Sequence, residues 1–105
     1  MKGERVGEFE ELLLLAIRAL GESYGVPIQE LLERTTGRTV SMGAVYAALD
    51  RLESKGLVAS TMGEATAERG GKRKRFFALT PFGTRAVHEA RQVRESMWLL
   101  REDRR

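Results

Sequence analysis

The chain has 105 residues, of which 42% are hydrophobic and 31% charged, so it is a single globular domain rather than a disordered polypeptide. It contains no cysteine, which excludes a disulfide framework and thiolate metal ligands. Residues 69–75 carry five cations and no acid; subtracting five from the net charge of +3 leaves −2 for the remainder. A cationic patch confined to one segment indicates a localised anionic partner.

No stretch of the sequence suits a membrane. The longest apolar run, residues 12–17, is too short to span a bilayer. The acidic residues that follow Arg5 do not resemble a secretory signal. We therefore expect a cytoplasmic protein with no membrane partner.

Residues 9–20 are predicted to form an amphipathic helix that ends at Gly21. Apolar residues recur there at i, i+3, i+4, i+7, i+8 and i+11. They are Phe9, Leu12, Leu13, Ala16, Ile17 and Leu20. Leu14 and Leu15 lie off this stripe, so we expect them to be buried against a second chain.

Two further helices follow with the spacing of a helix-turn-helix. Pro27 suits the first turn of the second helix, and Gly37 ends that helix. Ser41 is predicted to cap the third helix, and Gly56 to end it. The apolar stripe of the third helix consists of Val45, Ala48, Leu49 and Leu52.

The other surface near the start of the third helix is small and uncharged. It is formed by Met42, Gly43, Tyr46 and Ala47. Glycine inside a helix costs about 1 kcal/mol relative to alanine, and one use for Gly43 is to let another backbone come close. This pattern is typical of a recognition helix in a DNA groove. An ordinary core helix with a tolerated glycine explains it about equally well.

Residues 57–62 and 76–79 are predicted to be the strands of a hairpin, joined by a polar loop at 63–71. Phe77 and Leu79 should face the core, with Phe76 more exposed or covering an edge. A hairpin after a helix-turn-helix is a wing, and its cations suit contact with DNA phosphates or with the minor groove. These cations are Lys72, Arg73, Lys74 and Arg75. The alternative is a winged helix that binds only proteins.

The last predicted helix begins with Thr80 as N-cap and Pro81 as its first residue. Apolar residues then recur every 3.5 positions on average, the repeat of a coiled coil, so we expect a homodimer through this helix. The seam consists of Ala86, Ala90, Val93, Met97 and Leu100. Trp98 lies beside it, and two interpretations stay open: an anchor of the dimer contact, or the edge of a gap that stacks a planar aromatic effector.

Enzymatic and metal-binding functions find no support in the sequence. His88 is the single histidine, and no cysteine or suitably spaced acid accompanies it. Gly71-Lys72 lacks both the first glycine and the Ser or Thr of a phosphate-binding loop. We expect no catalytic residue, no metal ligand and no cofactor.

Three segments resemble the PadR family of bacterial transcriptional regulators: residues 7–25, 41–58 and 70–83, which together make up most of the chain. The pattern is a Gly-x-x-Tyr-x-x-Leu-x-x-Leu-Glu-x-x-Gly-Leu run from Gly43, followed by a basic wing that ends in Leu-Thr-x-x-Gly. The resemblance implies a winged-helix homodimer that contacts DNA through its third helix and wing, usually as a repressor.

The resemblance also assigns roles to individual residues. Ser41, Gly43 and Tyr46 match recognition-helix positions, residues 72–75 match the wing, and Tyr24 matches a tyrosine near the DNA side. Two departures stand out: many members have proline where Ala47 stands, and many carry a longer C-terminal helical domain. Because this chain resembles the short subgroup, an effector pocket of the longer members does not transfer to it.

The expected fold class is α+β, mainly α. A winged helix-turn-helix over residues 1–83 is followed by a C-terminal dimerisation helix over residues 84–105. The expected function is that of a ligand-responsive homodimeric repressor that binds a palindromic double-stranded DNA operator. A protein-interaction module without DNA binding is the alternative.

Overall fold

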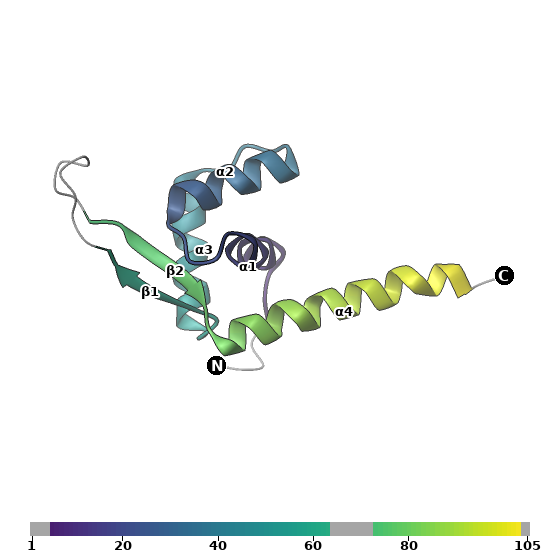
Figure 1. The fold of residues 1–105 in the computed structure, drawn as a ribbon. Coiled ribbons are helices and arrows are strands. Elements are labelled where there is room, and N and C mark those ends of the chain that lie inside the picture. The colour runs from purple at the N-terminus through teal and green to yellow at the C-terminus, as the bar shows by residue number, and fades with distance from the viewer. Residues whose placement is uncertain (1–4, 64–72, 104–105) are drawn as a thin grey trace.

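The computed structural model describes residues 5–63 and 73–103, and these form four helices and a two-stranded antiparallel sheet (Figure 1). The elements are α1 (Glu8–Leu20), α2 (Gly25–Thr36), α3 (Met42–Ser54), β1 (Val58–Met62), β2 (Arg75–Leu79) and α4 (Pro81–Asp103). The mainly helical winged-helix class predicted from the sequence is confirmed. Each expected element is present, with ends shifted by one or two residues.

The ends of α3 follow from its sequence. Ser41 Oγ accepts a hydrogen bond from the backbone N–H of Ala44 at 3.0 Å, so the predicted cap is formed. At the other end Gly56 adopts a left-handed φ of 78°. The N–H of Leu57 then bonds the carbonyl of Leu52, and that of Gly56 the carbonyl of Glu53, the pattern of a Schellman stop. The four predicted core residues of this helix are all fully buried.

The sheet closes one side of the helical core. β1 and β2 pair in the register Val58↔Leu79 to Met62↔Arg75. Phe77 is fully buried, Leu79 packs against the core, and Phe76 is half-buried, as predicted. Beyond the prediction, Ser23 in the α1–α2 turn forms a bridge to Phe77 through two backbone hydrogen bonds of 2.7 and 3.0 Å. The turn therefore adds a short third edge to the hairpin.

The first helix corrects one expectation. Leu14 is only 1% exposed and belongs to the core of its own chain, whereas its neighbour Leu15 is 40% exposed. The core extends around α1 because α2, α3, α4 and β2 all pack against this helix. The prediction that Leu14 is buried against a second chain was therefore wrong. Its side chain is already removed from water by the packing of its own domain.

The first part of the last helix is fixed firmly to the domain. Thr80 caps it, with its Oγ1 accepting from the N–H of Gly83 at 3.0 Å and donating to the carbonyl of Gly56 at 2.7 Å. Gly83 lies directly against the backbone of Leu57, where a Cβ would overlap the carbonyl oxygen. Beyond Ala90, the described side chains of α4 are exposed up to Leu100. The helix projects away from the side that carries the wing (Figure 1).

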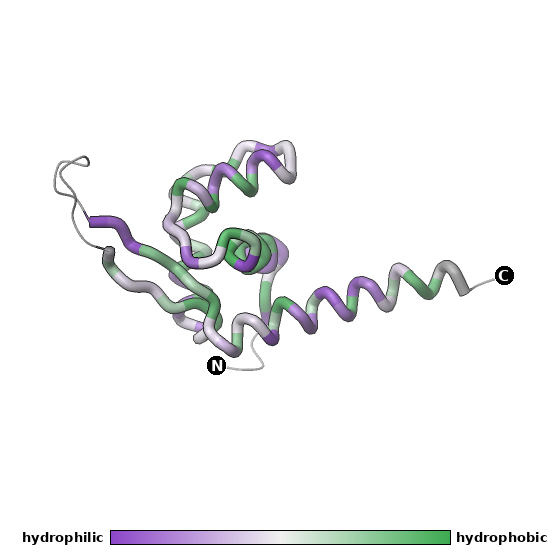
Figure 2. The backbone as a smooth tube through the Cα atoms, viewed as in Figure 1, coloured by the Kyte–Doolittle hydropathy of each residue, from purple (hydrophilic) through white to green (hydrophobic). Residues whose placement is uncertain are grey.

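The dimensions reflect this projecting helix. The radius of gyration is 15.7 Å, compared with roughly 13 Å for a compact domain of this length. Figure 2 shows hydrophobic colour both where α1 meets β2 and at intervals along the distal part of α4. Exposed apolar side chains that lie close together often mark interaction sites.

A buried carboxylate joins α1 to the end of α3. Glu10 accepts hydrogen bonds from Arg51 Nε and Lys55 Nζ, each at 2.7 Å, and from the Gly7 N–H at 3.0 Å. Burial alone would raise the pKa of Glu10, but these hydrogen bonds outweigh it and lower the pKa to about 2. The carboxylate thus stabilises the fold in its ionised form.

Glu10→Gln should lower the free energy of unfolding at pH 7 by about 3 kcal/mol, because the shift of the pKa from 4.5 to about 2 measures the stabilisation of the charged form. The native pKa is depressed, so this stabilisation is complete above about pH 5 and is lost as the pH falls towards 2. Urea unfolding from pH 7 to pH 2.5 measures it. Glu30→Gln, at an exposed position of α2, is the control, and an equal effect of both variants would contradict the assignment.

Candidate nucleic-acid interface

The start of α3 presents a surface without charge or bulk. Ser41, Gly43, Tyr46 and Ala47 are exposed, and Met42 is half-buried. A Cβ built on Gly43 would have no other atom within 4 Å. The glycine is therefore not required by packing inside the chain, which favours the recognition-helix interpretation over that of a core helix.

Tyr24 and Gly25 bring the wing next to α3. A Cβ on Gly25 would lie 2.6 Å from Tyr46 Oη and 2.8 Å from Met42 Cε, so α3 side chains cover this glycine. The neighbouring residue, Tyr24, packs edge-on against Phe76 of the wing, with ring centroids 5.4 Å apart. These contacts place the predicted recognition residues and the base of the wing on one continuous surface.

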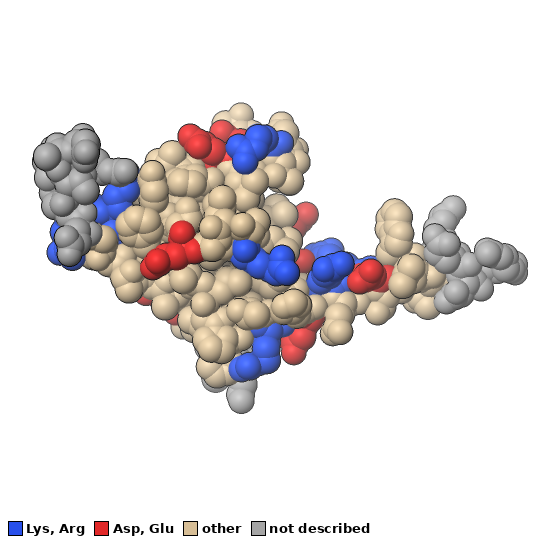
Figure 3. Space-filling model, viewed as in Figure 1, with Lys and Arg blue, Asp and Glu red and all other residues tan. Residues whose placement is uncertain are grey.

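Two cations extend this surface along the wing. Lys74 Nζ lies 4.3 Å from the centroid of the Tyr24 ring, a cation–π distance. Arg73 is exposed, and its Nε donates to the carbonyl of Gly63 at 2.9 Å. Figure 3 shows basic side chains at this end of the molecule, and others are spread over the rest of the same face. Lys72, which was also predicted to contact DNA, lies outside the described residues.

Arg75 differs from the other wing cations because its guanidinium has partners within the chain. Nη2 pairs with Glu53 Oε1 at 2.6 Å, Nη1 with Asp50 Oδ1 at 3.4 Å, and Nε donates to Ser60 Oγ at 3.2 Å. Ser60 in turn donates to the second oxygen of Glu53 at 2.8 Å. We refer to these four residues as the Arg75 network. The sequence analysis did not predict this network, because its members are brought together only by the packing of α3 against the hairpin.

The turn between α2 and α3 is held by two side chains that the sequence analysis also missed. Gln29 Nε2 donates to the carbonyl of Val40 at 2.7 Å, and Glu33 Oε2 accepts from the Val40 N–H at 2.8 Å. Both backbone polar groups of this residue are therefore satisfied by α2. This fixes the point from which α3 begins.

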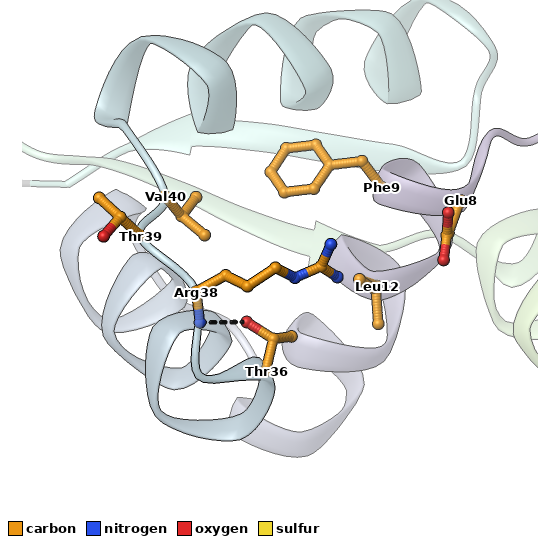
Figure 4. A pocket seen from close by; sticks show the side chains of 7 residues that line it. All are labelled: Glu8, Phe9, Leu12, Thr36, Arg38, Thr39 and Val40. Atoms are coloured by element: carbon orange, nitrogen blue, oxygen red, sulfur yellow. Dashed lines mark hydrogen bonds between the residues drawn. The ribbon is translucent and has the colours of Figure 1, made fainter.

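A hollow of about 170 Å³ lies beside the same turn, between it and the start of α1 (Figure 4). Phe9, Leu12 and Val40 supply apolar walls. The charged side chains that line it are Arg38 and Glu8, of opposite sign, so the hollow has no net charge to attract an anion.

The exposed face of α4 holds the remaining predicted residues. Val93, Met97 and Leu100 are 58–67% exposed and Trp98 is 76% exposed. Ala86 packs against the core, and Ala90 is half-buried. The first part of the predicted seam therefore packs on its own domain, and the distal part is exposed.

A second hollow, of about 340 Å³, lies where α4 passes α1, and Trp98 and Leu15 line it. Next to it Arg94 forms two hydrogen bonds of 2.8 Å to the carboxylate of Glu11. Arg94 lowers the pKa of Glu11, which burial by itself would raise. This bidentate pair is the ionic contact that joins the middle of α4 to α1.

Among residues 5–63 and 73–103, no group of three or more His, Asp or Glu side chains is arranged to hold a metal ion. None of the helices within these ranges combines the length and the hydrophobicity that a membrane span requires.

The chain matches the model of the transcriptional regulator PadR-like family over residues 13–89, more than half of its length. No curated protein matches it in sequence. Among solved structures, the complex structure of hsRosR-S1 is 30% identical, with a TM-score of 0.74, and the match covers 90% of this chain and 77% of that one.

Two bacterial structures have the same fold. A PadR-like transcriptional regulator from Bacillus cereus is 21% identical with a TM-score of 0.73, over 90% of this chain and 88% of that one. A transcriptional regulator from Clostridium thermocellum is 23% identical with a TM-score of 0.70, over 90% and 88%. At these identities the similarity shows the winged-helix fold alone. The family match over residues 13–89 shows the family as well as the fold. This chain is a DNA-binding transcriptional regulator of the PadR-like family and not an enzyme.

Proposed function

We propose that the chain is a cytoplasmic, homodimeric repressor that reads a palindromic operator. The observation that carries this proposal is the continuous surface formed by the start of α3, Tyr24 and the wing cations. An uncharged helix end beside a cationic hairpin matches the two parts of a DNA site, since base edges in the major groove lie next to charged phosphates.

The parts of this surface take different roles in the proposal. The start of α3 enters the major groove, where Ser41, Met42, Tyr46 and Ala47 contact base edges and Gly43 permits close approach of the helix. Tyr24 and the wing residues Lys72, Arg73 and Lys74 contact the sugar-phosphate backbone. Sequence specificity then comes from α3, and most of the affinity comes from the wing.

Dimerisation supplies the second half-site. We propose that two copies pair through the distal part of α4, with Leu15 extending the contact onto the domain. Val93, Met97 and Leu100 are exposed on this helix, and large apolar side chains at this density are rare on monomer surfaces. A two-fold dimer matches a palindrome whose half-sites lie about 34–36 Å apart. Repression follows when the occupied operator overlaps a promoter.

Replacing Arg73 and Lys74 with glutamine should weaken binding to every DNA sequence to a similar extent. The plot of log K against log salt should flatten by about one unit for each phosphate contact that is lost. Fluorescence anisotropy on genomic fragments, from 50 to 300 mM salt, measures both effects. Gln29→Ala removes an α2 side chain that bonds the α2–α3 turn without changing any charge, so it should leave the slope unchanged. Loss of discrimination at one base pair only would mean that the wing reads sequence.

We further propose that a planar aromatic effector binds at Trp98. The 340 Å³ hollow beside this indole supports the proposal, because aromatic surfaces stack with an energy beyond that of simple burial. A ligand there would lie next to the Glu11–Arg94 pair, so it could change the angle of α4 and hence the spacing of the two recognition helices.

Titration with flat aromatic compounds should quench the fluorescence of Trp98, the only tryptophan, over the same concentrations that release DNA. Trp98→Leu keeps an apolar side chain and should abolish release while leaving DNA affinity intact. Release that persists in this variant would place the effector site elsewhere.

A further inference from the structure

Arg75 belongs to the cationic run of the wing in the sequence, but its surroundings set it apart. Its guanidinium faces two carboxylates of α3 and lies over the Phe77 ring, with Cζ 4.9 Å from the centroid. Lys74 and Arg73, by comparison, contact an aromatic ring and a backbone carbonyl, and neither of these contacts neutralises a charge.

The network connects three elements in a closed set of contacts. Arg75 is the first residue of β2, Ser60 lies in β1, and Glu53 lies in the last turn of α3. Each of these three residues is hydrogen-bonded to the other two, at 2.6, 2.8 and 3.2 Å. Arg75 is the first residue of β2 and so follows directly after the loop of the wing. Its contacts therefore fix the angle between the wing and the recognition helix.

The charges argue against a phosphate contact by the same side chain. One cation faces two carboxylates, so the cluster has a formal charge of −1. If the guanidinium left its carboxylates for a phosphate, Asp50 and Glu53 would remain unpaired beside the DNA. The cations that these carboxylates attract would offset the counterion released from the DNA, so the move would gain little.

We propose that Arg75 is a positioning residue for DNA binding: it holds the wing against α3 through Glu53 and Ser60, and it does not contact phosphate. This inference rests on the proposed DNA site and divides the wing cations into two kinds. Arg73 and Lys74 carry the electrostatic attraction, and Arg75 sets the place where they act.

A charge exchange tests the proposal. Arg75→Glu should lower operator affinity at least tenfold, because like charges then separate the wing from α3. The double variant Glu53→Arg with Arg75→Glu reverses the pair at unchanged net charge, and it should restore affinity to within about threefold of wild type. The matched control is Glu53→Arg with Arg73→Glu, which has the same net charge but no pair to restore, and it should stay weak.

Two further measurements separate the possible failures. Arg75→Gln should keep the wild-type salt slope, whereas a slope that flattens by about one unit, together with no rescue by the exchange, would overturn the proposal. Thermal unfolding without DNA should show that the exchanged pair melts at a higher temperature than either single variant. If wild-type protein binds no DNA, the proposed function fails. The melting series then still decides whether the pair couples the wing to α3, and additive effects of the two changes would overturn that coupling.

Discussion

Replacing Val93 and Met97 with glutamate is expected to convert the protein to a monomer and to weaken operator binding by about 10²–10⁴-fold. Both side chains are exposed on the distal part of α4. In the proposed dimer each change places two carboxylates in an apolar contact, where an unpaired charge is costly. The loss of DNA affinity follows because two linked half-sites become two separate binding events.

Sedimentation velocity measures the first effect and anisotropy on a full operator the second. Gln92→Glu with Ser96→Glu is the matched control, since it adds the same two charges to the same turns of α4 on a neighbouring face. The control should remain dimeric. A dimer that survives the seam variant, or a control that dissociates equally, would show that α4 is not the dimer contact.

Gly83→Ala is expected to destabilise the domain by about 3 kcal/mol or more, a large part of the 5–15 kcal/mol available to a domain of this kind. The added methyl group would overlap the carbonyl oxygen of Leu57, and a backbone atom held between α3 and β1 cannot move aside as a flexible side chain would. The first turn of α4 must then separate from the domain.

Gly43→Ala is the control within the same fold. The new methyl group meets nothing within 4 Å, so the helix should gain about 1 kcal/mol of stability. Chemical denaturation of both variants measures the difference. Similar stability of the two would mean that the close contact of Gly83 with Leu57 does not constrain the fold.

The elements were predictable from the sequence because their signals are local. Ser41 and Thr80 cap helices, Gly37 and Gly56 end them with positive φ, and the apolar periodicity of α3 identifies four fully buried residues. These features depend on neighbours along the chain. The same holds for the position of the wing, since two short strands around a polar loop permit little else.

The errors and omissions concern contacts between distant residues. Leu14 lies off the ideal stripe of α1, but several elements surround this helix, so its buried face is wider than an amphipathic pattern predicts. The pairing of Arg75 with Glu53, and of Arg94 with Glu11, depends on how separate elements pack. A run of cations in a sequence shows where charge is, and only packing shows which charges are already neutralised.

The bridge between Ser23 and Phe77 also affects how the domain folds. It joins a turn near the start of the chain to the second strand of the wing, so the hairpin completes its hydrogen bonding only after α1 and the α1–α2 turn are in place. Loop closure over such a separation is slow compared with helix formation, which makes this docking a late step. Because contacts that form last are lost first when a structure opens, we expect the amides of Ser23 and Phe77 to exchange by local opening, faster than the amides in the buried core of α3.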